Sequence, residues 1–481
     1  MKLRVKSLEK LIRETPPPGQ GLRRCLGPVH LVLLGIGGIV GAGIFAMVGT
    51  AAAGDALRPG AGPALVVSFA LTGLACALTA LCYAEFASLV PISGSAYTYA
   101  YTTLGELVAW IIGWDLILEY AVGNVAVAVS WSGYFCELLN GLGLEFPRYL
   151  ATDLRTALHT PAIMAAAPRV LGVPLIFNLP AVGIVTAITV VLTVGIKESA
   201  WFNALMVGLK LVVLALFVVT GLFYVKPENW HPFAPNGWSG IQAGAAVVFF
   251  AFIGFDAVST TAEECRNPAR DLPIGILGSL AICTVIYVVV AAVLTGMIPW
   301  NQLNTEQPLS VAMRVVHQPV LAGIVAFGSV VAHTAVLLVF QLGQPRILLS
   351  MSRDGLLPSV LARTHPRFHT PHVATILTGV FVAVAAAIAS LDEMADLCNI
   401  GTLSAFLIVS LRVIVLRVRE PDRPRPFKTP WVPALPILGV AACLYLMFGL
   451  PASAWYRFGY WLVIGLAFYA AYGFWHSRVR G

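Results

Sequence analysis

The chain has 481 residues, of which 58% are hydrophobic and only 11% are charged, with a mean hydropathy of +0.84. Soluble domains carry roughly 25% charged residues, and no hydrophilic block of this chain is long enough to form one, so the composition excludes an ordinary soluble protein. The eight cysteines are scattered, mostly in apolar segments and without a C-x-x-C pair, which argues against a disulfide or zinc framework.

Twelve apolar runs are long enough to span a bilayer, which predicts an all-α integral membrane protein. They fall at 29–54, 61–85, 104–137, 179–198, 200–224, 240–262, 273–298, 319–349, 372–391, 394–417, 431–451 and 455–475. The third run is too long for a perpendicular span, so we expect it to tilt or protrude. The uncharged polar and aromatic stretch 90–103 is expected to pack as a connector at one membrane face.

The basic residues predict the orientation of these spans. Most of the 30 lysines and arginines fall in segments that share one side of the membrane if both termini are cytoplasmic. Because cytoplasmic loops carry an excess of Lys and Arg, residues 1–28 and 476–481 are predicted to be cytoplasmic tails. The net charge of +7 is then a topology signal, and we expect no nucleic-acid partner.

Glycine-rich interruptions break the first and the sixth apolar runs. They are G-I-G-G-I-V-G-A-G-I-F at 35–45 and F-F-A-F-I-G-F-D-A-V-S-T at 249–260. A broken helix frees backbone N–H and C=O groups, which the membrane interior tolerates only where those groups line a cavity. Paired interruptions in two halves of a chain indicate a transporter substrate site near the bilayer midplane.

The chemistry of the first break suits an anion. Glycine leaves helical geometry cheaply, and the N–H groups that it frees lie at the positive end of the following half-helix. These groups, from Gly41, Ala42 and Gly43, are therefore predicted to bind a carboxylate.

The second break suits a cation, because its carbonyls lie at the negative end of a half-helix. These carbonyls belong to Phe250, Ala251 and Ile253 and are predicted to bind an ammonium group. Donors on one side and acceptors on the other match the backbone of an α-amino acid. The alternative is that the glycines only allow close helix packing.

Lys210 lies in the middle of the fifth run, where a lysine costs roughly 2.5–3.5 kcal/mol on insertion scales. Its stem is too short to bring the ammonium group to the membrane surface. A buried lysine readily exchanges its proton, so Lys210 is a candidate for proton coupling, with a structural role as the alternative.

Further ionisable residues lie within the predicted spans. Glu119, with Asp115 one helical turn before it, could shape the substrate site or pair with a backbone group, and the sequence leaves both readings open. His333 is a possible proton relay, but we expect a hydrogen-bonded core histidine.

Several motifs together resemble bacterial members of the cationic amino acid transporter branch of the amino acid–polyamine–organocation superfamily, over nearly the whole chain. They are L-G-I-G-G-I-V-G-A-G-I-F (34–45), C-Y-A-E-F-A-S-L-V-P-I-S-G-S-A-Y-T-Y (82–99), G-W-D-L-I-L-E-Y (113–120), F-F-A-F-I-G-F-D-A-V-S-T-T-A-E-E (249–264), N-P-A-R-D-L-P-I-G-I (267–276) and S-R-D-G-L-L-P (352–358).

The resemblance implies a LeuT-like fold of two inverted five-helix repeats. The repeats would be 29–224 and 240–417, followed by two additional helices within 431–475, which gives 12 transmembrane helices. It also implies that Lys210 occupies the place of a sodium ion, as the matching lysine does in proton-coupled relatives. Ala42 replaces the Ser or Thr common in such glycine runs, so one hydroxyl contact to the carboxylate is missing.

The resemblance also suggests how the remaining part of the site is built. The substrate amine would bind carbonyls of helices 1 and 6, including that of Ile39. Sodium-coupled relatives bind sodium with hydroxyl oxygens on helix 8. This chain has His333-Thr334-Ala335 in that neighbourhood, which argues against coupling to sodium. Phe340 would face the side-chain end of the pocket and occupy volume that an arginine requires, whereas Glu119 could attract a cation.

We therefore predict a secondary active amino-acid transporter of a bacterial inner membrane, not an enzyme, that takes up substrate with protons and favours small neutral amino acids. An exchanger and a cationic amino acid transporter are the alternatives, and a non-transporting sensor is the alternative from another class. No cofactor or metal is expected, and no ATP-binding motif is present. The sequence leaves open the individual substrate, the stoichiometry, the oligomeric state and any accessory subunit.

Overall fold

The computed structural model describes residues 26–478 except 90–96, 98–99, 102–104, 171, 196–199 and 369. Most of the predicted tail 1–28, the end of the tail 476–481 and much of the predicted connector 90–103 therefore lie outside the described residues. Within the described part, eight helices are long and apolar enough to cross a membrane, and a ninth span results if one bent helix pair counts as one. The prediction of a mostly helical membrane protein is confirmed, whereas the number of spans is not.

The first half of the chain contains the first break and two short β-hairpins, and η denotes 3-10 or π-helical turns. In chain order its elements are α2 (Pro28–Ile39), η1 (Gly43–Met47), α3 (Val48–Ala53), β1 (Gly54–Asp55), β2 (Arg58–Pro59), η2 (Gly62–Ala64), α4 (Leu65–Leu89), α6 (Glu106–Ile117), η3 (Leu118–Val122), α7 (Gly123–Gly141), η4 (Arg148–Leu150), α8 (Leu154–Leu158), α9 (Pro161–Ala166), β3 (Arg169–Val170), β4 (Val173–Pro174), α10 (Leu179–Val194) and α11 (Ala200–Leu222).

The second half contains the second break and the longest single helix of the described chain. Its elements are η5 (Pro227–Trp230), α12 (Gly237–Val248), η6 (Phe249–Phe252), η7 (Asp256–Glu264), α13 (Pro268–Met297), η8 (Trp300–Gln302), α14 (Pro308–Val315), α15 (Pro319–Arg353), η9 (Ser359–Ala362), α16 (His372–Ile388), α17 (Leu391–Arg419), α18 (Ala434–Phe448), α19 (Ala452–Phe468), η10 (Tyr469–Gly473) and α20 (Phe474–His476).

The lengths of these helices agree with the hydropathy pattern. The third predicted span is a 36-residue helical run, Glu106–Gly141, and it is longer than a perpendicular crossing needs, as expected. Three apolar helices have fewer than 18 residues, which is short for a membrane span, although they coincide with predicted runs. They are Leu179–Val194, His372–Ile388 and Ala434–Phe448. The count of twelve spans therefore stays a prediction.

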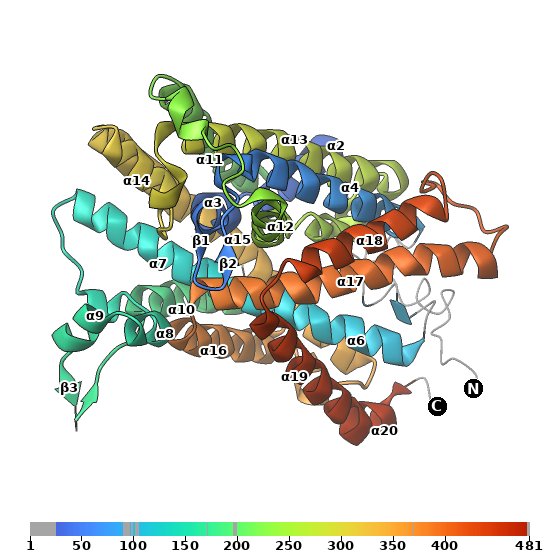
Figure 1. Ribbon diagram of the computed structural model, residues 1–481. Helices are drawn as coiled ribbons and strands as arrows, with labels where there is room; N and C mark the ends of the chain where they lie inside the picture. Colours follow the sequence, from blue (N-terminus) through green and yellow to red (C-terminus); the bar gives the residue numbers. More distant parts are fainter. Residues whose placement is uncertain are drawn as a thin grey trace.

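The second broken span lies at the centre of the bundle. Of its 18 most apolar consecutive residues, within Gly237–Ser259, 94% are buried, against 17% for the span Ala452–His476 at the periphery. Around it, α13 packs along α4 and α2, α15 packs along α7, and α17 packs along α18 (Figure 1). Because this central helix is surrounded by protein, its freed backbone groups face other helices instead of lipid, as a broken helix requires.

Candidate functional site

The two helix breaks meet each other in the interior. The first span bends by 46° between α2 and η1. At this bend, an added Cβ on Gly38 would lie 3.2 Å from the Gly254 carbonyl oxygen, and one on Gly43 would collide with the Ala251 backbone. The glycines therefore let the two broken backbones touch, and a substrate site at this contact stays a prediction.

The first break exposes backbone donors. The last bond of α2 runs from the Val40 N–H to the Ile36 carbonyl, and the next helix starts with the Phe45 N–H donating to the Gly41 carbonyl at 3.2 Å. The first N–H groups of a helix have no intrahelical acceptor, and here they belong to Ala42, Gly43 and Ile44. This matches the predicted carboxylate cradle to within one residue, although its ligand stays a prediction.

The second break exposes backbone acceptors. The turn η6 ends at Phe252, Ile253 is extended, and Gly254 has a φ of +112°, which a residue with a side chain rarely adopts. The last carbonyls of a helix lack intrahelical donors, and here these are the carbonyls of Phe250 and Ala251, of which the second accepts a hydrogen bond from Tyr287. The predicted amine-binding residues are thus brought beside the predicted carboxylate-binding ones.

Lys210 on α11 joins the first break and is fully buried. Its Nζ donates to the carbonyl of Gly37 at 2.6 Å and to that of Val40 at 2.9 Å. A cation at the C-terminal end of α2 interacts favourably with the negative end of the helix dipole. The lysine therefore satisfies two carbonyls of the broken segment, and a change in its protonation would act directly on these hydrogen bonds.

Tyr287 on α13 connects the two breaks, and the sequence analysis missed it. Its hydroxyl lies 3.0 Å from the carbonyl of Ile39 and 3.0 Å from that of Ala251. Since one O–H proton serves two acceptors, one carbonyl is left for another donor at any moment. A tyrosine inside an apolar run needs a polar partner, and that was the signal in the sequence.

Two carboxyl groups lie beside the second break. Glu119, on the π-helical turn η3, and Asp256, at the start of η7, are buried and interact electrostatically. The two carboxyl groups lie within hydrogen-bonding reach of each other, and Thr402 lies beside Glu119. A buried pair of this kind can hold a proton or an ammonium group, and a part for Glu119 in substrate binding stays a prediction.

An aromatic wall adjoins these carboxyl groups. The ring of Phe340 on α15 packs edge-on against that of Tyr120, with centroids 5.5 Å apart. One helical turn before Phe340, Val336 would be 2.7 Å from a Cβ on Gly41. The helix α15 therefore runs from the first break to this aromatic wall, and the role of Phe340 in selectivity stays a prediction.

His333 is a hydrogen-bonded core histidine, as favoured from the sequence. Its Nδ1 lies 2.6 Å from the Ser329 carbonyl oxygen and its Nε2 lies 2.7 Å from Ser130 Oγ. The carbonyl can only accept, so Nδ1 carries the proton and Nε2 accepts from the serine hydroxyl. The Nδ1 proton is therefore donated to a backbone carbonyl, which cannot take it up and pass it on, and this is unfavourable for a proton relay.

An ion pair that sequence analysis did not find ties the β1–β2 hairpin after the first broken span to the start of α17. Arg58 donates to Asp396 at 2.6 Å and to Asp55 at 2.9 Å, and Thr50 donates to Asp392 at 3.3 Å. Burial lowers the pKa of the Arg58 guanidinium, but the Asp396 and Asp55 carboxylates outweigh it and raise that pKa above its ordinary value. The guanidinium is therefore a fixed positive charge in this contact between the hairpin and α17.

A helical membrane bundle whose two broken helices meet around backbone donors and acceptors defines a membrane transporter. The chain belongs to the amino acid permease family, whose model matches residues 26–468. This identifies it as an amino-acid transporter and a multi-pass membrane protein, as the sequence predicted.

Individual relatives match most or nearly all of the chain. A branched-chain amino acid permease of Bacillus subtilis is 49% identical over 99% of this chain and 98% of its own length. A methylthioribose transporter of the same organism is 45% identical over 99% of both chains. Cationic amino acid transporter 4 of Mus musculus is 37% identical over 88% of this chain and 63% of its own length. These relatives are transporters and not enzymes, which agrees with the predicted class.

Proposed function

We propose that this protein is a secondary active transporter that imports a neutral amino acid together with protons by alternating access. The observation that carries the proposal is the contact between the two breaks, because it sets free N–H donors beside free carbonyl acceptors. An α-amino acid presents one carboxylate and one ammonium group, and each finds a complementary helix end in this site.

The fold that would support transport by alternating access is the LeuT-like fold. Its two inverted repeats are 29–224 and 240–417, and two further helices follow within 431–475. The three shorter apolar helices would complete twelve spans, at positions where hydropathy predicts them. Both termini would be cytoplasmic in a bacterial inner membrane, which the distribution of Lys and Arg supports.

Lys210 is the proposed proton carrier. Its two carbonyl acceptors belong to the broken segment of the first span, so loss of its charge would weaken the contacts that hold this segment. We propose that protonated Lys210 stabilises the first break in the conformation that binds substrate, and that deprotonation of Lys210 lets this segment move.

The proposed substrates are neutral aliphatic amino acids, beginning with alanine. The buried Phe340–Tyr120 wall supports this choice because a ring there leaves little volume for a long cationic side chain. The branched-chain permease relative extends the range to valine, leucine and isoleucine. Methylthioribose is a second candidate, favoured by the relative at 45% identity.

Uptake by proteoliposomes tests the proposal. The panel contains alanine, valine, leucine, arginine and methylthioribose, each with and without an inward proton gradient. We expect a neutral amino acid to accumulate only with the gradient, and Lys210→Ala to lose this accumulation while remaining folded. Gradient-driven accumulation by the Ala variant with an unchanged pH dependence would contradict the role of Lys210. Equal uptake with and without the gradient, stimulated by internal amino acid, would instead identify an exchanger.

A further inference from the structure

A groove of about 640 Å³ lies where α13 begins, away from the two breaks. One wall is the first three turns of α13, and the other is the connection between α17 and α18. Its lining includes Arg270, Ile274, Leu277, Gly278, Pro426 and Phe427. None of these residues takes part in the transport site described above.

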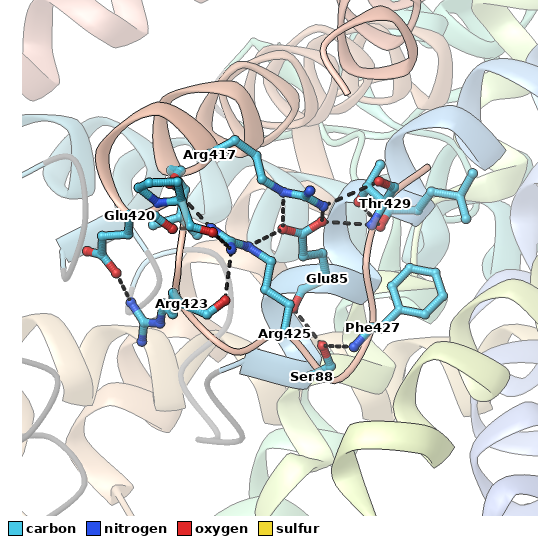
Figure 2. Close-up of polar contacts among 11 residues, drawn as sticks. Glu85, Ser88, Arg417, Glu420, Arg423, Arg425, Phe427 and Thr429 are labelled. Carbon is cyan, nitrogen blue, oxygen red and sulfur yellow. Dashed lines mark hydrogen bonds and ion pairs between the residues drawn. The ribbon is translucent and has the colours of Figure 1, made fainter. Parts of the chain in front are cut away.

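The second wall is fixed to the bundle and is not a loose loop. The buried Glu85 at the end of α4 pairs with Arg417 at 2.9 Å and with Arg425 at 3.2 Å, and it accepts the Thr429 N–H at 2.8 Å (Figure 2). Close by, the Phe427 N–H donates to Ser88 Oγ at 3.3 Å. These bonds hold the Pro426–Phe427 segment over the end of α4, so the groove is part of the fold.

The edge of the groove is positively charged. Arg270 is exposed, and its guanidinium makes no ion pair within the part of the chain that the structure describes. Arg266, one turn before it, and Lys428, next to Phe427, are also exposed. The neighbouring acid, Asp271, is buried. Asp271 in the first turn of α13 offsets the positive end of that helix, so the three exposed basic side chains make this edge complementary to an anion.

An apolar strip leads away from this edge. Ile274, Ile282, Val285 and Val289 are 40%, 42%, 65% and 40% exposed, and their spacing places them along one face of α13. From Ile274 to Val289 the strip covers about 22 Å at a rise of 1.5 Å per residue, more than the ~15 Å depth of one leaflet. The groove therefore joins a cationic end to a lipid-facing apolar surface.

We propose that this groove binds a phospholipid with an anionic headgroup. The headgroup lies against Arg270 and the first turn of α13, and one acyl chain follows Ile274 along the helix. The charge of the edge selects an anionic headgroup over a zwitterionic one, and the continuous apolar strip selects a lipid over a soluble anion. The site would be on the membrane side that holds the end of α17 and the start of α13.

Native mass spectrometry of the detergent-purified protein, titrated with phosphatidylglycerol or phosphatidylcholine, tests the proposal. We expect phosphatidylglycerol to bind more tightly, and Arg270→Gln to weaken it about fivefold, the effect of one basic residue near an anionic headgroup. Arg363→Gln is the matched control, since Arg363 is an exposed arginine that does not line the groove. It should bind phosphatidylglycerol like the wild type.

A second variant tests the acyl-chain path. Ile274→Asn places a polar, uncharged amide on the strip and should also weaken phosphatidylglycerol binding without changing the charge of the edge, and thermal unfolding checks that each variant is folded. Equal binding of the two lipids, or unchanged binding by folded Arg270→Gln, would overturn the proposal. Displacement of the lipid by inorganic phosphate together with normal binding by Ile274→Asn would show a site for a free anion, and this too would overturn it.

Discussion

Gly254→Ala is predicted to destabilise the protein at the contact between the two breaks. Gly254 has a φ of +112°, and a Cβ there would lie 2.8 Å from the Gly38 carbonyl oxygen. The left-handed conformation costs an L-residue about 1–2 kcal/mol and an overpacked contact about 1–3 kcal/mol. We therefore expect a loss of about 2–5 kcal/mol in the free energy of unfolding, measured by reversible unfolding in SDS-containing mixed micelles.

Gly208→Ala is the matched control for this measurement. A Cβ on Gly208 would meet no atom within 4 Å, and the residue lies inside the helix α11. Alanine is favoured over glycine there by about 1 kcal/mol, so this variant should be as stable as the wild type or more stable. Gly254→Ala should also lose the thermal stabilisation caused by substrate. Equal unfolding free energies for the two variants, with substrate stabilisation retained, would refute the reasoning.

Three further substitutions test the Phe340–Tyr120 wall, the Tyr287 hydroxyl between the two breaks, and the ion pair between Arg58 and Asp396. Phe340→Ser should admit larger or cationic amino acids in competition uptake assays, and arginine displacing label from the wild type better than alanine would show that the proposed selectivity is wrong. Tyr287→Phe removes one shared hydrogen bond and should lower the unfolding free energy by about 1 kcal/mol, whereas no change would mean that the hydroxyl does not join the breaks. Arg58→Gln leaves the buried Asp396 without its cation and should cost about 3–5 kcal/mol. The double variant with Asp396→Asn should recover most of this loss, and an equally unstable double variant would contradict the pairing.

Sequence alone predicted the membrane class and the positions of the helices. A membrane-spanning segment must satisfy its backbone hydrogen bonds internally, so apolar length is enough to locate it. The predicted run 273–298 corresponds to Pro268–Met297, and the predicted run 319–349 corresponds to Pro319–Arg353. The breaks were also predictable, because glycines inside an apolar run are a local signal for backbone that leaves the helix.

The partners of the polar groups were not predictable from the sequence, because they come from distant parts of the chain. Lys210 could be recognised as an unusual residue, but its acceptor Gly37 lies 173 residues away. Arg58 and Asp396 are separated by 338 residues, and neither stands out in its own segment. Local composition reports only that a buried charge or hydroxyl needs a partner. The packing of the helices decides which partner it finds.

Hydropathy and glycine spacing by themselves therefore determined that this is a helical membrane protein with two broken spans. The tertiary structure alone decided that the breaks touch, that Lys210 and Tyr287 bind their carbonyls, and that Glu119 lies with Asp256. The physical reason is that helix formation in a membrane is a local requirement of the backbone, whereas a site is assembled from side chains whose positions depend on how all the helices pack.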